Sequence, residues 1–162
     1  MARLKVSDGI DNYINMLHTC AAQTESIIKR SAYEGARVVM DAVKAEAQTI
    51  PTHGSTRGST ETVVGLTPTQ KAGVIESLGI AHFREDGNFI NVKIGSDGYN
   101  TVFTQKYRRG QPNAMLIRSL ESGTSFREPY PFVSRAVAKT RGKAVETMRK
   151  QCDEEIKKYI QT

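Results

Sequence analysis

The residues of this chain with the clearest chemical potential are two sets of basic side chains in its second half. One set surrounds Tyr107, and the other lies near the start of the last expected helix: Lys106, Arg108 and Arg109, then Lys139, Arg141 and Lys143. Positive side chains gathered on one face can contact successive phosphates of a nucleic acid. They can equally form a solvated face or a docking surface for an acidic partner. The sequence leaves these three alternatives open.

The excess of basic over acidic residues also lies in the second half of the chain. The formal net charge is +6, from 23 basic and 17 acidic residues. Up to Phe83 the two kinds cancel, at 8 against 8, whereas from Arg84 onward 15 basic residues stand against 9 acidic ones. The whole positive excess therefore belongs to the C-terminal half.

Residues typical of catalysis or metal binding are poorly placed for either. The three histidines, His18, His53 and His82, fall in an expected helix, loop and strand, with no HExxH pair and no nearby cysteine ligand. No serine stands in a G-x-S-x-G motif. Glu85 and Asp86 are adjacent carboxylates, but we expect them in a hairpin turn, where both would be solvated. The sequence thus predicts no catalytic residue, no metal, no cofactor and no small-molecule substrate.

Composition is that of one ordinary soluble domain spanning residues 1–162. Hydrophobic residues make up 38% and charged residues 25%. No apolar run approaches the roughly 20 residues needed to cross a bilayer, and the first residues lack the apolar region of a secretory signal, so we expect a cytosolic protein without membrane partners. Cys20 and Cys152 are far apart, and we expect both to be reduced thiols in the core.

A long helix is expected from Ser7 to about Gln48. Apolar and small residues recur at steps of four and three, which is one face of a helix: Ile10, Ile14, Leu17, Ala21, Thr24, Ile28, Gly35, Val39 and Ala42. The small residues Gly35 and Ala42 would let another backbone approach closely. Unbroken, such a helix would be roughly 60 Å long, so it must either break near Gly35 or project onto a neighbouring molecule.

The middle of the chain is expected to hold loops and a β-hairpin. Pro51 ends the first helix, and a flexible loop is expected at about 52–69, where Gly54 to Thr60 only weakly resembles a phosphate-binding loop. Lys71 to Ile80 should form a short amphipathic turn that leads into a strand. The hairpin pairs 80–84 with 89–94 around a turn at 85–88, and its second strand presents Ile90, Val92 and Ile94 to one side.

The residues with the strongest backbone conformational preferences lie in an expected corner between two helices. Gly123 follows the apolar residues of a short helix and can adopt the positive φ that ends one. Thr124 and Ser125 offer hydroxyls to the backbone groups left free there, and Pro131 suits the first position of the next helix. Before the corner, Tyr99 to Gln105 could add a third strand within a second long loop at about 98–112.

The last helix is expected to run from about Phe132 to Ile160. Its buried side should carry Val133, Val137, Thr140, Ala144, Met148, Cys152, Ile156 and Tyr159, and Lys157 with Lys158 suit the negative end of the helix dipole. The resulting fold class is α+β: a long N-terminal helix, a small antiparallel sheet, a short helix, and a long C-terminal helix packed on the sheet.

The order of these motifs resembles a family, the neck and tail-completion (tail-component) proteins of long-tailed phages. The first helix matches at Ala32, Gly35, Ala36, Val39, Ala42, Lys44, Ala47 and Pro51. The segment before the hairpin matches at Gly73, Ile75, Ser77, Leu78 and Gly79. The corner matches at Glu121, Gly123, Thr124, Pro131, Phe132 and Ala136. The resemblance covers about residues 32–136, and its force comes from the order and spacing of the motifs together.

This resemblance implies a structural virion protein of the tail or neck, assembled in the host cytoplasm and without enzymatic activity. It implies a ring of identical subunits, with a hexamer as the expected size. Its neighbours would be the head connector and the tail-tube or tail-terminator proteins, with DNA passing through the lumen as a further partner. Glu121, Gly123, Thr124, Pro131 and Phe132 would form the structural corner, and Lys106, Arg108 and Arg109 would face DNA or a partner. The alternative from charge alone is a small basic nucleic-acid-binding module.

Overall fold

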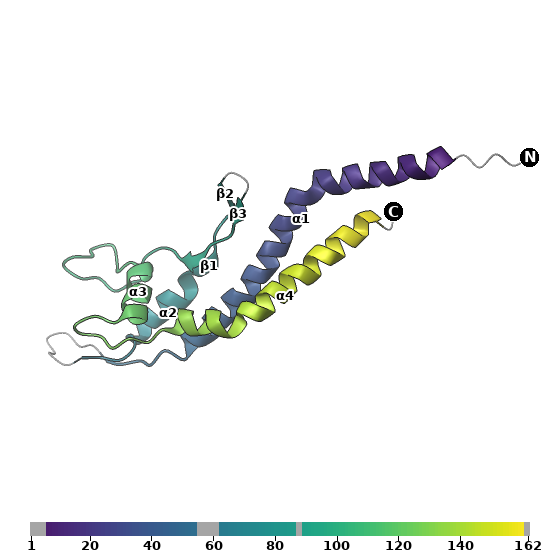
Figure 1. Cartoon of the computed structure of the whole chain (residues 1–162). Coiled ribbons are helices and arrows are strands. Elements are labelled where there is room, and N and C mark those ends of the chain that lie inside the picture. The colour runs from purple at the N-terminus through teal and green to yellow at the C-terminus, as the bar shows by residue number, and fades with distance from the viewer. Residues whose placement is uncertain (1–5, 55–61, 87–88, 161–162) are drawn as a thin grey trace, which may run out of the picture.

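The computed structural model describes residues 6–54, 62–86 and 89–160 (Figure 1). Over these residues the elements follow in the order α1 (Val6–Gln48), α2 (Pro68–Ser77), β1 (Leu78–Ile80), β2 (Arg84–Asp86), β3 (Phe89–Asn91), β4 (Ile94–Ser96), α3 (Asn113–Ser122) and α4 (Phe132–Ile160). The α+β class is confirmed, with a long helix at each end of the chain and small antiparallel strands between them. No helix in the described part is both long and apolar enough to cross a membrane.

Helix α1 is unbroken over 43 residues, which gives it a length of about 64 Å at 1.5 Å per residue. Of the two alternatives raised by its length, a break at Gly35 is therefore wrong. Gly35 lies instead against α4, because a Cβ placed on it would stand 2.4 Å from Cγ of Met148. The small residue was correctly predicted to admit a neighbouring helix.

The two long helices run antiparallel and hold each other by ion pairs as well as by packing (Figure 1). Near one end of the shared length, Arg30 Nη1 lies 2.8 Å from Oε2 of Glu155. Near the other end, Glu46 accepts from Lys139 and lies 3.4 Å from Nε of Arg135. These pairs fix the register of α1 against α4.

The apolar core of the described residues lies where the C-terminal half of α1 meets α2, α3 and the start of α4. Its fully buried large side chains are Phe132, Ile50, Leu66, Leu120, Val43 and Val74. Ile80 of β1 and Ile94 of β4 are half-buried against it. The strands therefore border a core made mainly by helices.

The predicted hairpin is present as two short antiparallel ladders. In one, β1 pairs with β4 through Ile80 and Ile94; in the other, β2 pairs with β3 through Glu85 and Ile90. The residue numbers of each pair add up to 174 in the first ladder and to 175 in the second. The register therefore shifts by one residue between the ladders, which means that one strand has an extra residue there, as in a β-bulge. The turn is shorter than predicted, since β2 extends to Asp86; Gly87 and Asn88 lie outside the described residues.

The third strand predicted at Tyr99 to Gln105 is wrong. Only Tyr99 makes an isolated bridge, to Pro112, and the chain then turns back on itself, with Thr104 and Tyr107 exchanging two backbone hydrogen bonds of 3.2 and 3.1 Å. Phe103 is 67% exposed, so no apolar face was available to hold a strand there. The segment 98–112 is a long loop, as its length indicated.

The loop expected at 52–69 is shorter and better anchored where it is described. Helix α2 starts at Pro68, and Thr67 caps it in a reciprocal pair of hydrogen bonds with Gln70. Thr52 bridges Leu66, whose side chain is fully buried in the core. Most of the Gly54 to Thr60 segment lies outside the described residues.

The corner between α3 and α4 has the predicted glycine but different capping groups. Gly123 has φ 71° and ψ 173°, so φ is positive while ψ is extended rather than left-handed helical. The backbone of Thr124, and not its hydroxyl, bonds to Arg127. Pro131 precedes the first residue of α4 instead of occupying it. The free N–H groups of α4 are capped by Glu121, whose carboxylate accepts from Val133 N at 2.7 Å.

Three further expectations need correction, two about burial and one about secondary structure. Val137 is exposed and not part of the buried side of α4, while Ala136 and Glu155 are buried there instead. Cys20 and Cys152 are free, as predicted, but half-buried rather than in the core. His82 lies between β1 and β2 and not in a strand.

Candidate functional site

The first candidate surface is the N-terminal part of α1, where the helix runs on beyond the end of α4 (Figure 1). Helix α4 ends at Ile160, five residues after Glu155, which pairs with Arg30. Figure 1 shows that α1 bends and that its first turns reach beyond the end of α4. Residues 6–24, about 28 Å of helix, are here called the arm.

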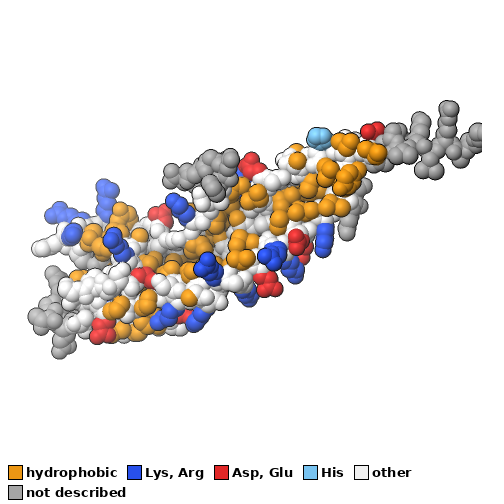
Figure 2. Space-filling view, in the orientation of Figure 1, with side chains coloured by type: hydrophobic (Ala, Val, Ile, Leu, Met, Phe, Trp, Pro, Cys, Tyr) orange, Lys and Arg blue, Asp and Glu red, His pale blue; other side chains and the backbone are white. Residues whose placement is uncertain are grey.

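The arm carries an exposed apolar stripe. Four large side chains at helical spacing share its face, and each keeps about half of its surface exposed: Ile10 (54%), Tyr13 (59%), Ile14 (44%) and Leu17 (49%). Figure 2 shows hydrophobic side chains continuing along the arm beyond the two-helix region. Isolated exposed apolar residues are normal on a protein surface, but a contiguous row marks an interaction site.

This stripe is the continuation of the face that packs against α4. Seven-residue steps lead from Gly35, which touches α4, through Ile28 to Ala21, and steps of four and three then reach Leu17 and Ile14. At this level the buried side of α1 carries Ile27, which is 4% exposed, while Ile28 beside it is 43% exposed. The apolar face of α1 is therefore longer than the helix that covers it.

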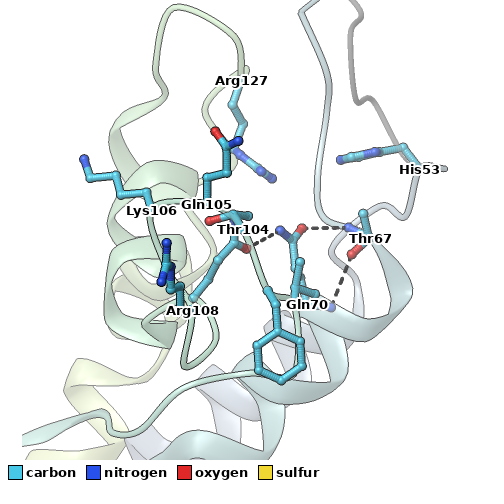
Figure 3. A pocket seen from close by; sticks show the side chains of 11 residues that line it. His53, Thr67, Gln70, Thr104, Gln105, Lys106, Arg108 and Arg127 are labelled. Carbon is cyan, nitrogen blue, oxygen red and sulfur yellow. Dashed lines mark hydrogen bonds between the residues drawn. The ribbon is translucent and has the colours of Figure 1, made fainter.

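The second candidate surface is an open cavity of about 940 Å³, the basic pocket, at the end of the molecule away from the arm (Figure 3). Its walls come from the segment before α2, from α2 itself, from the loop 98–112 and from the turn after α3. The lining residues are His53, Thr67, Gln70, Val102, Phe103, Thr104, Gln105, Lys106, Arg108, Gln111 and Arg127. None of these is acidic.

Arg127 is the most buried charged group in this pocket, with only 6% of the residue exposed. Its Nη1 donates to the carbonyl oxygen of Gly65, and its Nε has no hydrogen-bond partner among the described residues. It makes no ion pair with any described carboxylate. Burial lowers the pKa of the Arg127 guanidinium, but arginine stays protonated in proteins, so a positive charge is held below the surface.

His53 faces the same cavity from the opposite wall (Figure 3). Its Nδ1 lies 2.6 Å from the carbonyl oxygen of Gly54, and its buried Nε2 has no partner among the described residues. His53 Nε2 and Arg127 Nε are the two buried side-chain atoms left without a partner in the described part of the chain. Both belong to this pocket, which indicates a place prepared for a polar ligand.

The basic residues singled out in the sequence are distributed by the fold between different surfaces. Lys106 and Arg108 are exposed at the rim of the basic pocket, and Arg109 is exposed on the same loop without lining this pocket. Lys139 pairs with Glu46, while Arg141 and Lys143 are exposed on α4. The two sets predicted from the sequence therefore do not form one basic face.

Three of the five corner residues, Glu121, Gly123 and Phe132, make contacts inside the fold, whereas Thr124 is exposed and Pro131 is half-buried. Phe132 is completely buried, and Glu121 is engaged with the start of α4 through Val133 and Ser134. A Cβ on Gly123 would stand 3.1 Å from Cδ of Pro129. Their contacts hold α3 against α4.

Sequence reasoning missed Arg127 and Tyr13, and it did not connect His53 with the basic loop. Arg127 stands next to Glu128 and in no recognised motif, and its contact with the carbonyl oxygen of Gly65 joins residues 62 apart in the sequence. Tyr13 could have been found, because it stands three residues after Ile10 on the predicted stripe.

No group of three or more His, Cys, Asp or Glu side chains in the described part of the chain is arranged to hold a metal ion. Comparison of the chain with protein-family models, with curated proteins and with solved structures finds no match.

Proposed function

We propose that the chain is a structural subunit that assembles with copies of itself, as a ring component of the neck or tail end of a long-tailed phage. The observation that carries the proposal is the arm, whose apolar stripe continues the α1–α4 interface past the end of α4. The order of sequence motifs supports the phage assignment. A head connector and tail-tube or tail-terminator proteins are the proposed neighbours of the ring.

A second copy is the proposed occupant of the arm stripe. The stripe suits a helix, because the same side of α1 receives α4 of the same chain farther along, at Gly35. A second copy brings helices of the same kind, with exposed apolar side chains of their own at Val137 and Val145. Continuity with an interface that the fold already uses favours self-association over an unrelated partner.

The energy of one such contact argues for more than one contact per subunit. Fully burying a large apolar side chain is worth about 1.5–3 kcal/mol, and the four on the arm keep only about half of their surface exposed, so together they supply about 3–6 kcal/mol. Association costs roughly 4–15 kcal/mol in lost freedom. A single arm contact is therefore marginal, whereas a closed ring gives each subunit two contacts.

The virion role is tested by electron microscopy of phage particles produced without this protein. We expect DNA-filled heads without tails and tails that are not joined to heads. Normally joined, infectious particles would contradict the assignment. Restoring the protein from a plasmid should restore joining, which controls for effects on neighbouring genes.

The second candidate function, a basic module that binds nucleic acid by itself, is favoured by Lys106 and Arg108 at the rim of one pocket. It predicts binding to free duplex DNA that weakens steeply with salt. The assembly proposal predicts weak binding in a gel-shift titration, because the basic residues are divided between surfaces. Replacing Lys106, Arg108 and Arg109 with alanine and finding DNA retention and infectivity unchanged would exclude a DNA-facing role for this loop.

A further inference from the structure

We propose that the basic pocket is a binding site for a compact oxyanion, a phosphate or carboxylate group, with the Arg127 guanidinium as its central donor and Lys106 and Arg108 as its rim charges. This inference does not rest on the arm or on the virion role. It rests on a buried charge, on unsatisfied polar atoms and on the composition of one cavity.

The first step is the state of Arg127. A buried charge is costly unless it is paired, and Arg127 is 6% exposed with no carboxylate partner among the described residues. One carbonyl oxygen, that of Gly65, accepts from Nη1. The planar guanidinium has five N–H donors in a fork that matches a carboxylate or a phosphate, so an anion in the cavity would balance its charge.

The second step is the rest of the lining. Gln70, Gln111 and Thr67 are already tied to one another, with Gln70 Nε2 2.6 Å from Gln111 Oε1 and Gln70 N 3.3 Å from Thr67 Oγ1. These hydrogen bonds give the floor a fixed shape (Figure 3). Lys106 and Arg108 add two positive charges at the edge, and the described lining has no negative charge to oppose an anion.

The rim charges stand on a loop that is held in place. Asn100 N donates to Gln111 O at 3.0 Å and Asn100 Oδ1 accepts from Val102 N at 2.8 Å. Gly110 has φ 98°, and a Cβ there would stand 1.8 Å from the carbonyl oxygen of Asn100. The loop can therefore present Lys106 and Arg108 to the pocket without being ordered first by a ligand.

The depth of Arg127 indicates which anions can reach it. Nucleic-acid backbones are contacted by side chains that project from a surface, whereas Arg127 lies within the walls of a pocket. A rigid duplex would meet Lys106 and Arg108 but not Arg127. A small free anion, or a carboxylate on a flexible side chain of an approaching subunit, can enter.

The test is a titration of the full-length protein with inorganic phosphate and, separately, with acetate, followed by two-dimensional NMR at constant ionic strength. We expect saturable shifts at the pocket residues with both probes. Because charge-assisted hydrogen bonds are worth about 1.5–3 kcal/mol, Arg127→Gln should weaken binding about tenfold or more. The rim variant Lys106→Gln with Arg108→Gln leaves the buried contacts intact and should weaken binding about threefold or more by loss of charge.

The matched control is Arg141→Gln with Lys143→Gln, which removes the same two charges from an exposed part of α4. It should bind as the unchanged protein does. If Arg127→Gln fails to fold, Arg127→Lys and the rim variant are measured in its place.

Shifts that do not saturate would overturn the proposal. So would an equal loss of binding in the rim variant and in the control variant. Saturation by acetate and phosphate alike would indicate a general carboxylate or phosphate receptor, whereas binding of duplex DNA that depends on Arg127 would contradict the restriction to compact anions.

Discussion

Gly35 of α1 and Met148 of α4 are in such close contact that no side chain fits between them. A Cβ on Gly35 would stand 2.4 Å from Cγ and 2.8 Å from Sδ of Met148, and 3.2 Å from the carbonyl oxygen of Ala144. The two long helices thus meet at a glycine.

Replacing Gly35 with leucine should force α1 and α4 apart. Overpacking of this kind typically costs about 1–3 kcal/mol, and we expect a lower Tm in thermal unfolding followed by circular dichroism. Gly142→Ala is the matched control, because Gly142 lies in α4 with nothing near its Cβ position. That change should raise stability by about 0.5–1 kcal/mol. A Gly35→Leu protein as stable as the unchanged one would contradict the close contact.

The cap that Glu121 provides predicts a second effect on stability. Its carboxylate accepts from Val133 N at 2.7 Å and from Ser134 Oγ at 2.6 Å. Loss of a helix cap typically costs about 1 kcal/mol, so Glu121→Ala should lower Tm by about 2–4 °C. Glu128→Ala removes an exposed carboxylate close by in sequence and should leave Tm unchanged. Equal effects of the two changes would show that Glu121 does not cap α4.

Glu155 predicts a pH dependence of stability. Its carboxylate accepts from Lys158 Nζ at 2.5 Å and from Arg30 Nη1 at 2.8 Å. The hydrogen bond from Lys158 and then that from Arg30 hold the pKa of Glu155 below its usual range, while burial acts in the opposite direction. A lowered folded pKa gives stability that is present above the unfolded pKa of about 4.3 and is lost as the pH falls through the folded value.

The measurement is Tm as a function of pH for the unchanged protein and for Glu155→Gln. We expect the variant to have a lower Tm at neutral pH and a shallower decline below the ordinary glutamate pKa. Glu154→Gln, at an exposed position beside it, is the control and should keep the decline. Parallel curves for the unchanged protein and Glu155→Gln would mean that the carboxylate contributes nothing through its charge.

The helices were predictable because their signals are periodic and local. The bounds of α4 agree with the prediction at both ends, and α1 differs by one residue at its start. The alternation of Ile90, Val92 and Ile94 was also correct, since these side chains are half-buried and those between them are exposed. The strand predicted at Tyr99 to Gln105 failed because the fold provides no partner strand or apolar surface there.

The candidate sites were predictable only in part, for a physical reason. The position of the arm stripe could be predicted from the helical spacing of its apolar residues. Its exposure depends on where α4 ends, and that is set by the tertiary structure. The basic pocket joins His53 and Arg127, 74 residues apart in sequence, and neither stands in a motif. Lys106 and Arg108 could be singled out as charged, whereas the buried cation that they accompany could not.

The most direct test of the central claim, that the arm is a surface for self-association, is sedimentation equilibrium over a rising range of protein concentration. The unchanged protein should show an average mass that climbs above the 17.9 kDa of one chain. Ile14→Asp with Leu17→Asp should keep the mass of a single chain at every concentration while its Tm stays the same, because the arm lies outside the core. A protein that remains at 17.9 kDa at the highest concentration, or a variant that associates as well as the unchanged chain, would contradict the account.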